Sequence, residues 1–263
     1  MIEGWMNTDQ PKLTVRLARD AADIQAAQRL RYRVFIQELG GTGPLVDHAL
    51  KLERDELDPY FDHLLLVNTD LNPDDGQHVV GAYRLLPCDR LDQTGRFYCD
   101  HEFDLHPLRA TGRKLLELGR SCVDKAYRGG PAMFLMWQAL AAYVARHRID
   151  ILFGAASFHG TDPHALAQPL SLLHHRHLAP PELRVRARNY QRMDLLAPDR
   201  LDRKAAVAQL PSLIKAYLRI GGVVGDGAFI DPEFRTTDIC LILDTNAMTR
   251  AAHSLAPKGF LAP

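Results

Sequence analysis

A strand, a glycine turn, a helix and a second strand follow one another between residues 115 and 156, and this order constrains the fold most. Leu115–Val123 is apolar enough for a buried strand, and Gly129-Gly130-Pro131 breaks it. Met133–Arg146 has the length of a packed helix, and Ile149–Ala156 is a second apolar strand. Such a β-α-β unit predicts that the two strands are parallel neighbours in one sheet.

The flanking segments add further strands and helices to this unit. Residues 13–17 alternate like a strand, a helix follows from the N-cap candidate Asp20 to Gly40-Gly41, and 63–86 reads as a hairpin. Residues 87–112 look irregular. In the last third, the patterns predict helices at 162–175 and 211–220 and strands at 183–188 and 238–243. No repeat or linker forces a boundary. We therefore expect one α/β domain over residues 1–263, with a core at 13–156 and a C-terminal elaboration at 157–263.

Charge and cysteine content exclude several classes of protein. The 263 residues include 32 Lys and Arg against 32 Asp and Glu, so the formal net charge is zero. This balance argues against a globally basic nucleic-acid binder, and no nucleic-acid partner is expected. The four cysteines stand far apart without a C-x-x-C pair, which argues against a disulfide scaffold and a zinc ribbon. We interpret the run His174–His177 as a solvated helix end, and no metal is expected.

Localisation is predicted from two segments. Residues 1–12 lack the basic-then-apolar pattern of a signal peptide. The longest nearly apolar stretch, Ala132–Ala145, is shorter than the ~20 residues that span a bilayer. We expect a cytoplasmic protein, and peripheral contact with the inner membrane stays open.

Charged residues recur inside segments that the pattern predicts to be buried. Arg84 interrupts the strand at 79–86, and Glu117 and Arg120 interrupt the strand at 115–123. In a regular strand, residues 117 and 120 point to opposite faces unless a bulge intervenes. A buried charge without a partner costs several kcal/mol, so these groups are expected to pair or to face a cleft.

Three more charged residues and one aromatic residue belong to this set. Arg31 and Phe35 are four apart on the first helix and therefore share a face, and Asp55 and Asp58 precede the strand at 63–68. Two readings are open. The charges form a structural salt-bridge network at the sheet edge, or they converge on a site for a zwitterionic or amino-bearing ligand.

The order of four short motifs resembles the acyl-homoserine lactone synthases, GNAT-like acyltransferases that use acyl carrier protein. The motifs are Arg31-x-x-x-Phe35, Glu53–Asp58, Gly81–Leu86 and Glu117–Arg120. The chain departs from that family because residues 36–46 lack its usual tryptophan. The stretches Tyr217–Gly222 and Ile230–Asp238 look instead like a sister group, the ornithine N-acyltransferases of bacterial ornithine-lipid synthesis, often labelled "hemolysin-like". That resemblance extends over nearly the whole chain.

The resemblance implies a GNAT-like fold, with a mixed central sheet flanked by helices. It also implies transfer of a 3-hydroxyacyl group from acyl carrier protein to the α-amine of L-ornithine, giving lyso-ornithine lipid. Acyl-acyl carrier protein is then a co-substrate, and no cofactor is expected. Two alternatives remain, an enzyme like the acyl-homoserine lactone synthases and a non-catalytic module that binds acyl carrier protein or lipid.

Aminolysis of a thioester suggests roles for the charged set. The substrate ammonium must lose a proton before it attacks, and Glu117 is the candidate base because it lies mid-strand. Arg84 and Arg120 suit the substrate carboxylate, since a guanidinium binds it in bidentate geometry. Asp55 and Asp58 suit the side-chain ammonium of ornithine.

The acyl donor is expected at Arg128-Gly129-Gly130, which stands where the family has its pyrophosphate loop. Pro131 offers no N–H there, and such a weakened coenzyme A loop fits a carrier-protein donor. A plain strand-to-helix turn is the alternative.

Arg184, Arg186 and Arg188 form the basic cluster expected to dock the acidic carrier protein. On a strand these three side chains line one face. A solvated basic edge that discourages strand pairing explains the cluster equally well.

Overall fold

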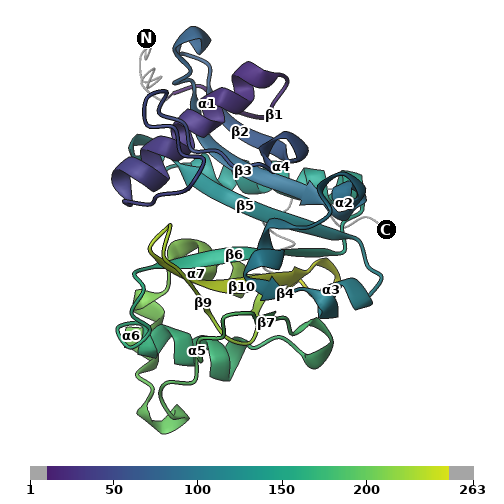
Figure 1. The fold of residues 1–263 in the computed structure, drawn as a ribbon, viewed down its shortest axis with the longest axis vertical. Coiled ribbons are helices and arrows are strands. Elements are labelled where there is room, and N and C mark those ends of the chain that lie inside the picture. Colours follow the sequence, from purple (N-terminus) through teal and green to yellow (C-terminus); the bar gives the residue numbers. More distant parts are fainter. Residues whose placement is uncertain (1–10, 249–263) are drawn as a thin grey trace, which may run out of the picture.

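The computed structural model describes residues 11–248. Eight strands form one mixed sheet with the order β1-β2-β3-β5-β6-β10-β8, and β9 pairs with β10 beside this path (Figure 1). The strands are β1 Leu13–Leu17, β2 Asp62–Asn68, β3 Val79–Pro87, β5 Leu115–Val123, β6 Ile151–His159, β8 Val223–Val224, β9 Phe229–Asp231 and β10 Thr236–Asp244. Strands β4 (Phe103–Asp104) and β7 (Arg186–Ala187) form a separate small sheet. The mixed central sheet that the resemblance implies is confirmed.

Strands β5 and β6 are the parallel pair of the sheet, as the β-α-β pattern predicted. Helix α4 (Ala132–His147) connects them. The other neighbouring strands run antiparallel, including the predicted hairpin of β2 and β3. Strand β6 pairs with β10 along all nine residues, which joins the C-terminal part to the core sheet. The division into one domain stays a prediction.

Helices α1 and α4 cover opposite faces of the sheet, and the alternation of β2 shows why. Leu65 and Val67 pack in a cluster with residues of α1 (Ala21–Arg31), whereas Leu64 and Leu66 pack in a cluster with residues of α4. Asp20 caps α1 as predicted, because its side chain accepts the N–H of Asp23. The helix continues as a π-helical stretch at 32–38.

The C-terminal part differs from the prediction in two places. Helix α5 spans Ala167–His177, so it starts later than predicted, because Asp162 accepts the N–H of His164 in a local turn that competes with helix. The strand predicted at 183–188 shortens to β7, because a 3-10 turn precedes it and backbone bonds to Glu102 and Asp226 replace a longer ladder.

The remaining helices lie around the sheet. They are α2 Leu91–Thr94 and α3 His106–Ala110, in the region predicted to be irregular, and α6 Arg203–Gln209 and α7 Ser212–Arg219. The helix predicted at 211–220 is thereby confirmed as α7. Figure 1 shows α5 and α6 on the side of β6 and β10 that lies away from β5. Within residues 11–248, no helix has the length and apolar composition needed to cross a membrane.

The parallel pair opens partway along its length. β5 and β6 are hydrogen-bonded only at 115–117 and 151–153, and beyond this point they diverge. Gly154 marks the last close approach, because a Cβ there would lie 2.2 Å from the carbonyl oxygen of Leu118. A side chain at this position would push the strands apart, so the start of the gap depends on glycine.

Candidate active site

A β-bulge places Arg120 and Glu117 in the same cavity. Arg84 pairs with Gly119, but Ala82 pairs with Cys122, so β5 holds one extra residue at this point. Arg120 has a φ of 48°, in the left-handed region. The bulge breaks the alternation that would otherwise turn residues 117 and 120 to opposite faces.

Arg31 and Arg84 are completely buried in an ionic network with three acids. Nη1 of Arg31 lies 2.6 Å from Oδ1 of Asp58, and its Nε donates to Glu53. Nη1 of Arg84 donates to Asp55 at 2.6 Å and to Asp58 at 2.8 Å. Both aspartates expected at the substrate ammonium therefore already hold an arginine.

The network stays ionised. Burial alone would raise the pKa of Glu53, but the charges of Arg31 and Arg120 outweigh it and lower that pKa to about 2. Asp58 is likewise desolvated, and the charges of Arg31 and Arg84 hold its pKa well below the usual range. This is the structural salt-bridge network that was one of the two readings of the sequence. It contacts the cavity through Arg120, which pairs with Glu53.

Arg120 is the member of the network that reaches the cavity. Its Nε donates to Glu53 at 3.1 Å, and its guanidinium lies 4.8 Å from the ring centre of Tyr98 and 4.5 Å from that of Phe234. Arg84 is not among the lining residues. Of the two arginines expected to bind the substrate carboxylate, Arg120 is therefore the one in contact with the cavity.

Glu117 also lines the cavity, and its orientation is fixed by the backbone of the 87–112 segment. Its carboxylate accepts the N–H of Tyr98 at 2.8 Å and the N–H of Cys99 at 2.6 Å. Burial raises its pKa above the usual glutamate value despite these bonds. The segment was predicted only as irregular, so nothing in the sequence pointed to this contact.

The cavity encloses about 220 Å³ between the π-helical stretch at 32–38, the 87–112 segment, the diverging strands and the turn from β9 to β10. Four carboxyl groups and one guanidinium line it. They belong to Glu102, Glu117, Asp231, Asp238 and Arg120. Phe35 lines the cavity too, as expected, whereas Glu102, Asp231 and Asp238 were missed. Two of the missed residues lie in the stretch Ile230–Asp238 that carried the family resemblance, which was the available signal.

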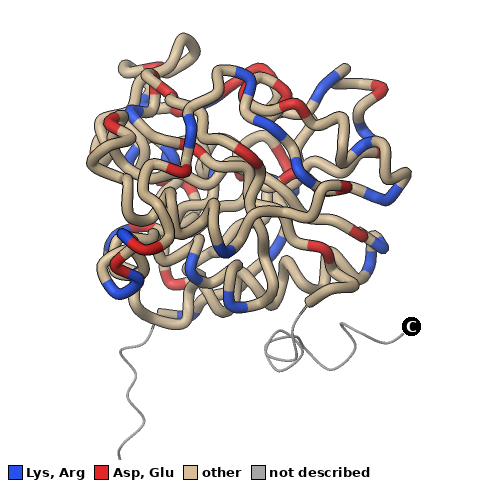
Figure 2. Tube along the Cα trace, turned by 90° about the horizontal axis from the view of Figure 1, so that it is seen from below, with Lys and Arg blue, Asp and Glu red and all other residues tan. Residues whose placement is uncertain are grey.

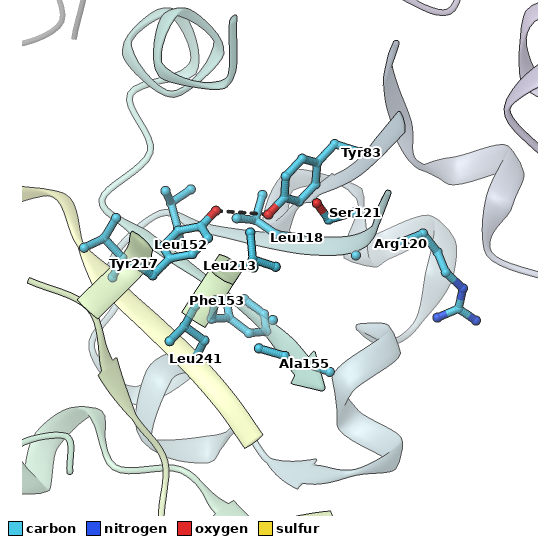
Figure 3. A pocket seen from close by; sticks show the side chains of 14 residues that line it. Tyr83, Leu118, Arg120, Ser121, Leu152, Phe153, Ala155, Leu213, Tyr217 and Leu241 are labelled. Carbon is cyan, nitrogen blue, oxygen red and sulfur yellow. Dashed lines mark hydrogen bonds between the residues drawn. The ribbon is translucent and has the colours of Figure 1, made fainter. Parts of the chain in front are cut away.

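A second, apolar cavity fills the gap between β5 and β6 (Figure 3). Leucines of both strands, of β10 and of α7 line it. The hydroxyls of Tyr83 and Tyr217 are hydrogen-bonded at 3.1 Å on its wall, and Ser121 lies beside Tyr83, while Arg120 points away from this pair. The two cavities share Gly119–Ser121 and Leu213, so they meet in the gap.

A third cavity of about 590 Å³ lies at the start of α4, where the acyl donor was expected. Arg128 and Gly129 line it, and Gly130 does not. The Arg128 guanidinium donates to both oxygens of Glu38, at 2.5 and 2.8 Å. Gly129 has a φ of 78°, which the tight turn into the helix requires. This cavity shares Phe35, Leu39, Ser121 and Leu213 with the first cavity.

The three arginines of the expected docking cluster differ in exposure, and only Arg186 of the three lies in a strand. Residues 183, 185 and 187 are buried, and Arg186 and Arg188 are exposed. Arg184 is half-buried, and its Nε donates to the carbonyl of Ala179. Arg186 pairs with Asp226 at 3.0 Å, and Arg188 donates to the carbonyl of Asp100. Figure 2 shows acidic and basic positions intermingled over the trace in that view.

Comparisons with known proteins place this geometry in a family. The sequence model of the acetyltransferase (GNAT) domain matches residues 30–138. An L-ornithine N(alpha)-acyltransferase of Rhodobacter capsulatus is 62% identical over 235 residues, covering 89% of this chain and 91% of that protein. One of the same name from Brucella abortus is 43% identical, covering 88% and 84%.

Solved structures agree on the fold. FeeM, an N-acyl amino acid synthase from uncultured soil microbes, superposes with a TM-score of 0.51 at 14% identity, covering 97% of this chain and all of that one. The acyl-homoserine lactone synthase LasI gives 0.51 at 16% identity, covering 92% and 95%. The expected GNAT-like fold is confirmed, and the chain is an acyltransferase that belongs to the family of L-ornithine N(alpha)-acyltransferases.

Proposed function

We propose that this acyltransferase moves a 3-hydroxyacyl group from acyl carrier protein to the α-amine of L-ornithine, giving lyso-ornithine lipid. One observation carries the proposal. A cavity with one guanidinium and four carboxyl groups opens onto an apolar cavity in the gap between β5 and β6. Ornithine has one carboxylate and two ammonium groups, so its charges complement the first cavity. The names of the relatives support the same amine.

The proposed chemistry is aminolysis of a thioester. Arg120 binds the α-carboxylate of ornithine, and the Glu117 carboxylate takes one proton from the α-ammonium. The free amine attacks the thioester carbonyl, and the tetrahedral intermediate expels the pantetheine thiolate. The second amine proton passes to that thiolate as the amide forms, so atoms and charge balance. The raised pKa of Glu117 makes it a stronger base than an exposed carboxylate.

The oxyanion of the intermediate needs hydrogen-bond donors in the gap. The bulge takes residues 120 and 121 out of the regular ladder with β3, and β5 and β6 do not pair beyond residues 117 and 153. Backbone N–H groups are therefore available on both sides of the gap. We assign the oxyanion and the pantetheine arm to these groups.

We assign the acyl carbons nearest the carbonyl to the apolar cavity, which has a volume of about 40 Å³ and whose leucines would exclude water from them. In this cavity the hydroxyls of Tyr83 and Tyr217 provide a polar pair. A 3-hydroxyl group on the chain can exchange hydrogen bonds with that pair, whereas a plain acyl chain cannot. This arrangement supports a 3-hydroxyacyl donor.

A carrier protein is the proposed source of the acyl group. Arg128 already pairs with Glu38, and Pro131 has no N–H for a pyrophosphate. Arg184, Arg186 and Arg188 would meet the acidic carrier. We assign the reaction to the cytoplasm. Peripheral contact with the inner membrane is supported by Met133 and Phe134, which are exposed beside the third cavity.

The direct test offers the enzyme a mixture of all proteinogenic amino acids plus ornithine, together with a 3-hydroxyacyl-acyl carrier protein. Mass spectrometry then identifies the acylated product. We expect N-acylornithine as the main product, with no equivalent product from coenzyme A thioester at the same concentration. Dominant acylation of another amino acid would refute the assigned amine, and equal use of coenzyme A would refute the assigned donor.

A further inference from the structure

Three buried carboxyl groups meet in the wall of the first cavity away from the Arg31 network. One side-chain oxygen each of Glu102, Asp231 and Asp238 lies within 4.8 Å of the other two. The side chains come from separate segments, since Glu102 precedes β4, Asp231 ends β9 and Asp238 lies in β10. All three residues are more than nine-tenths buried.

The guanidinium that lines the same cavity acts on these carboxyl groups only through its longer-range charge, which opposes the rise in the pKa of Glu102 and of Asp238. Arg120 forms its ion pairs with Glu53 and Asp55. Within residues 11–248, Oε2 of Glu102 and Oδ1 of Asp238 are buried without a hydrogen-bond partner. Leaving a buried acceptor unsatisfied costs roughly 1–3 kcal/mol, and the described part of the chain supplies no donor to either atom, so a ligand that donates hydrogen bonds would stabilise them.

The protonation behaviour of these carboxyl groups agrees with a cation site. Burial raises the pKa of Glu102 well above the usual value, and the charges of Asp238 and Asp231 raise it further. Burial raises the pKa of Asp238 to about 6. A bound cation would lower both values and restore the ionised forms.

We propose that Glu102, Asp231 and Asp238 bind the distal ammonium of the amino-acid substrate and thereby select a diamino acid. An ammonium group has three N–H donors at tetrahedral angles, so oxygens about 2.8 Å from its nitrogen lie about 4.6 Å apart, which the spacing of the three carboxyl groups allows. The inference rests on the proposed function, because ornithine supplies that ammonium. It assigns the distal ammonium to this trio instead of Asp55 and Asp58, which hold Arg84 and Arg31.

The test compares ornithine with norvaline, which has the same carbon skeleton and a hydrogen in place of the δ-amine. The variants are Glu102→Gln, Asp231→Asn and Asp238→Asn. The matched control is Asp244→Asn, on the same strand as Asp238 but paired with Arg113. We expect each of the three to lower kcat/KM for ornithine by roughly 10–100-fold and that for norvaline far less. The control should keep the wild-type ratio of the two amines.

Melting temperature separates recognition from a structural role. Neutralising one of three clustered acids removes repulsion, so the free variants should melt at the wild-type temperature or higher. Equal losses for both amines, with a melting temperature lowered by several degrees, would overturn the proposal. A second result would also overturn the proposal. If a chelator abolished the preference for ornithine and added Mg²⁺ or Ca²⁺ restored it, the trio would hold a metal ion.

Binding without the acyl donor keeps this inference distinct from the proposed function. If the wild-type enzyme acylates no ornithine, the proposed function fails. Calorimetric titration with ornithine and norvaline then tests separately whether the trio binds the distal ammonium. Tighter binding of ornithine by the wild type but not by Asp238→Asn upholds the proposal, and equal binding of the two amino acids by the wild type overturns it.

Discussion

Arg31 and Asp58 form an ion pair in the protein interior, with Nη1 and Oδ1 2.6 Å apart and side chains that are 0% and 2% exposed. Arg84 shares the same carboxylate at 2.8 Å. A buried charge is strongly destabilising when its partner is removed, so the pair and its neighbours depend on one another. The pair thus fixes α1 against the turn at Asp58–Tyr60, and Arg84 joins that turn to β3, the strand beside the bulge.

Asp58→Asn should therefore act on stability. We expect a loss of about 3–5 kcal/mol in the free energy of unfolding, measured by denaturant titration. Ornithine and norvaline should be acylated with proportionally equal losses. The Asp55 side chain is 19% exposed and pairs mainly with Arg84, so Asp55→Asn should lower the free energy of unfolding by less than Asp58→Asn does. Normal stability together with a loss confined to ornithine would return Asp58 to the role of ammonium ligand.

The pH dependence of this pair has a defined sign. The folded-state pKa of Asp58 is lowered, so its contribution to stability is complete above the ordinary aspartate value near 3.9 and declines as the pH falls below it. The difference in unfolding free energy between wild type and Asp58→Asn should be constant from pH 5 to 8 and should shrink toward pH 2. A difference that grew on acidification would contradict the ion-pair account.

Glu117→Gln should reduce turnover by roughly 100–10,000-fold, because the variant has no carboxylate to accept the amine proton. In the wild type, kcat/KM should fall as the pH drops through a value above the usual glutamate pKa, since only the ionised form is a base and burial raises that pKa. The control is Glu56→Gln, which changes an exposed acid in the loop before β2 and should keep the wild-type turnover. Near-normal turnover of Glu117→Gln between pH 6 and 9 would remove Glu117 from the mechanism.

Reversing the basic cluster tests the docking surface. Arg184, Arg186 and Arg188 together changed to Glu should raise the KM for acyl carrier protein, with kcat for a small pantetheine thioester retained. The salt dependence of association should also weaken, because fewer opposite charges steer the encounter. An unchanged KM and an unchanged salt dependence would place docking on another surface.

Tyr217→Phe tests the preference for a 3-hydroxyl group. The change removes one hydroxyl of the Tyr83–Tyr217 pair and leaves the ring in place. We expect a 3-hydroxyacyl donor to lose roughly 5–13-fold in kcat/KM, because a hydrogen bond to the chain contributes on the order of 1–1.5 kcal/mol. A plain acyl donor of equal length is the internal control. Equal effects on both donors would exclude the tyrosine pair from donor selection.

The sequence predicted the sheet well because its strands carry their own signals. The apolar runs of β5 and β6 and the glycine turn before α4 were enough to predict a parallel pair. From the sequence, a bulge was only a condition under which residues 117 and 120 could face the same side of the sheet. The bulge itself could not be predicted, because the left-handed φ of Arg120 depends on how β5 packs against β3.

The candidate site was predictable in part for the same reason. Glu117 and Arg120 stood out as charges within apolar strands, whereas Glu102 lies in a region without a periodic pattern. The pairing of β9 with β10 brings Asp231 and Asp238 together, and Glu102 reaches them from a segment more than 100 residues earlier in the chain. Contacts between segments more than 100 residues apart leave no local mark on the sequence.

The central claim is that one cavity holds ornithine with its α-amine at the gap and its distal amine at the acidic trio. The most direct measurement is tandem mass spectrometry of the product formed from ornithine labelled with ¹⁵N at the δ position. The account predicts an amide on the unlabelled α-nitrogen and a free labelled amine. An acyl group on the labelled nitrogen, or an equal mixture of the two amides, would contradict it.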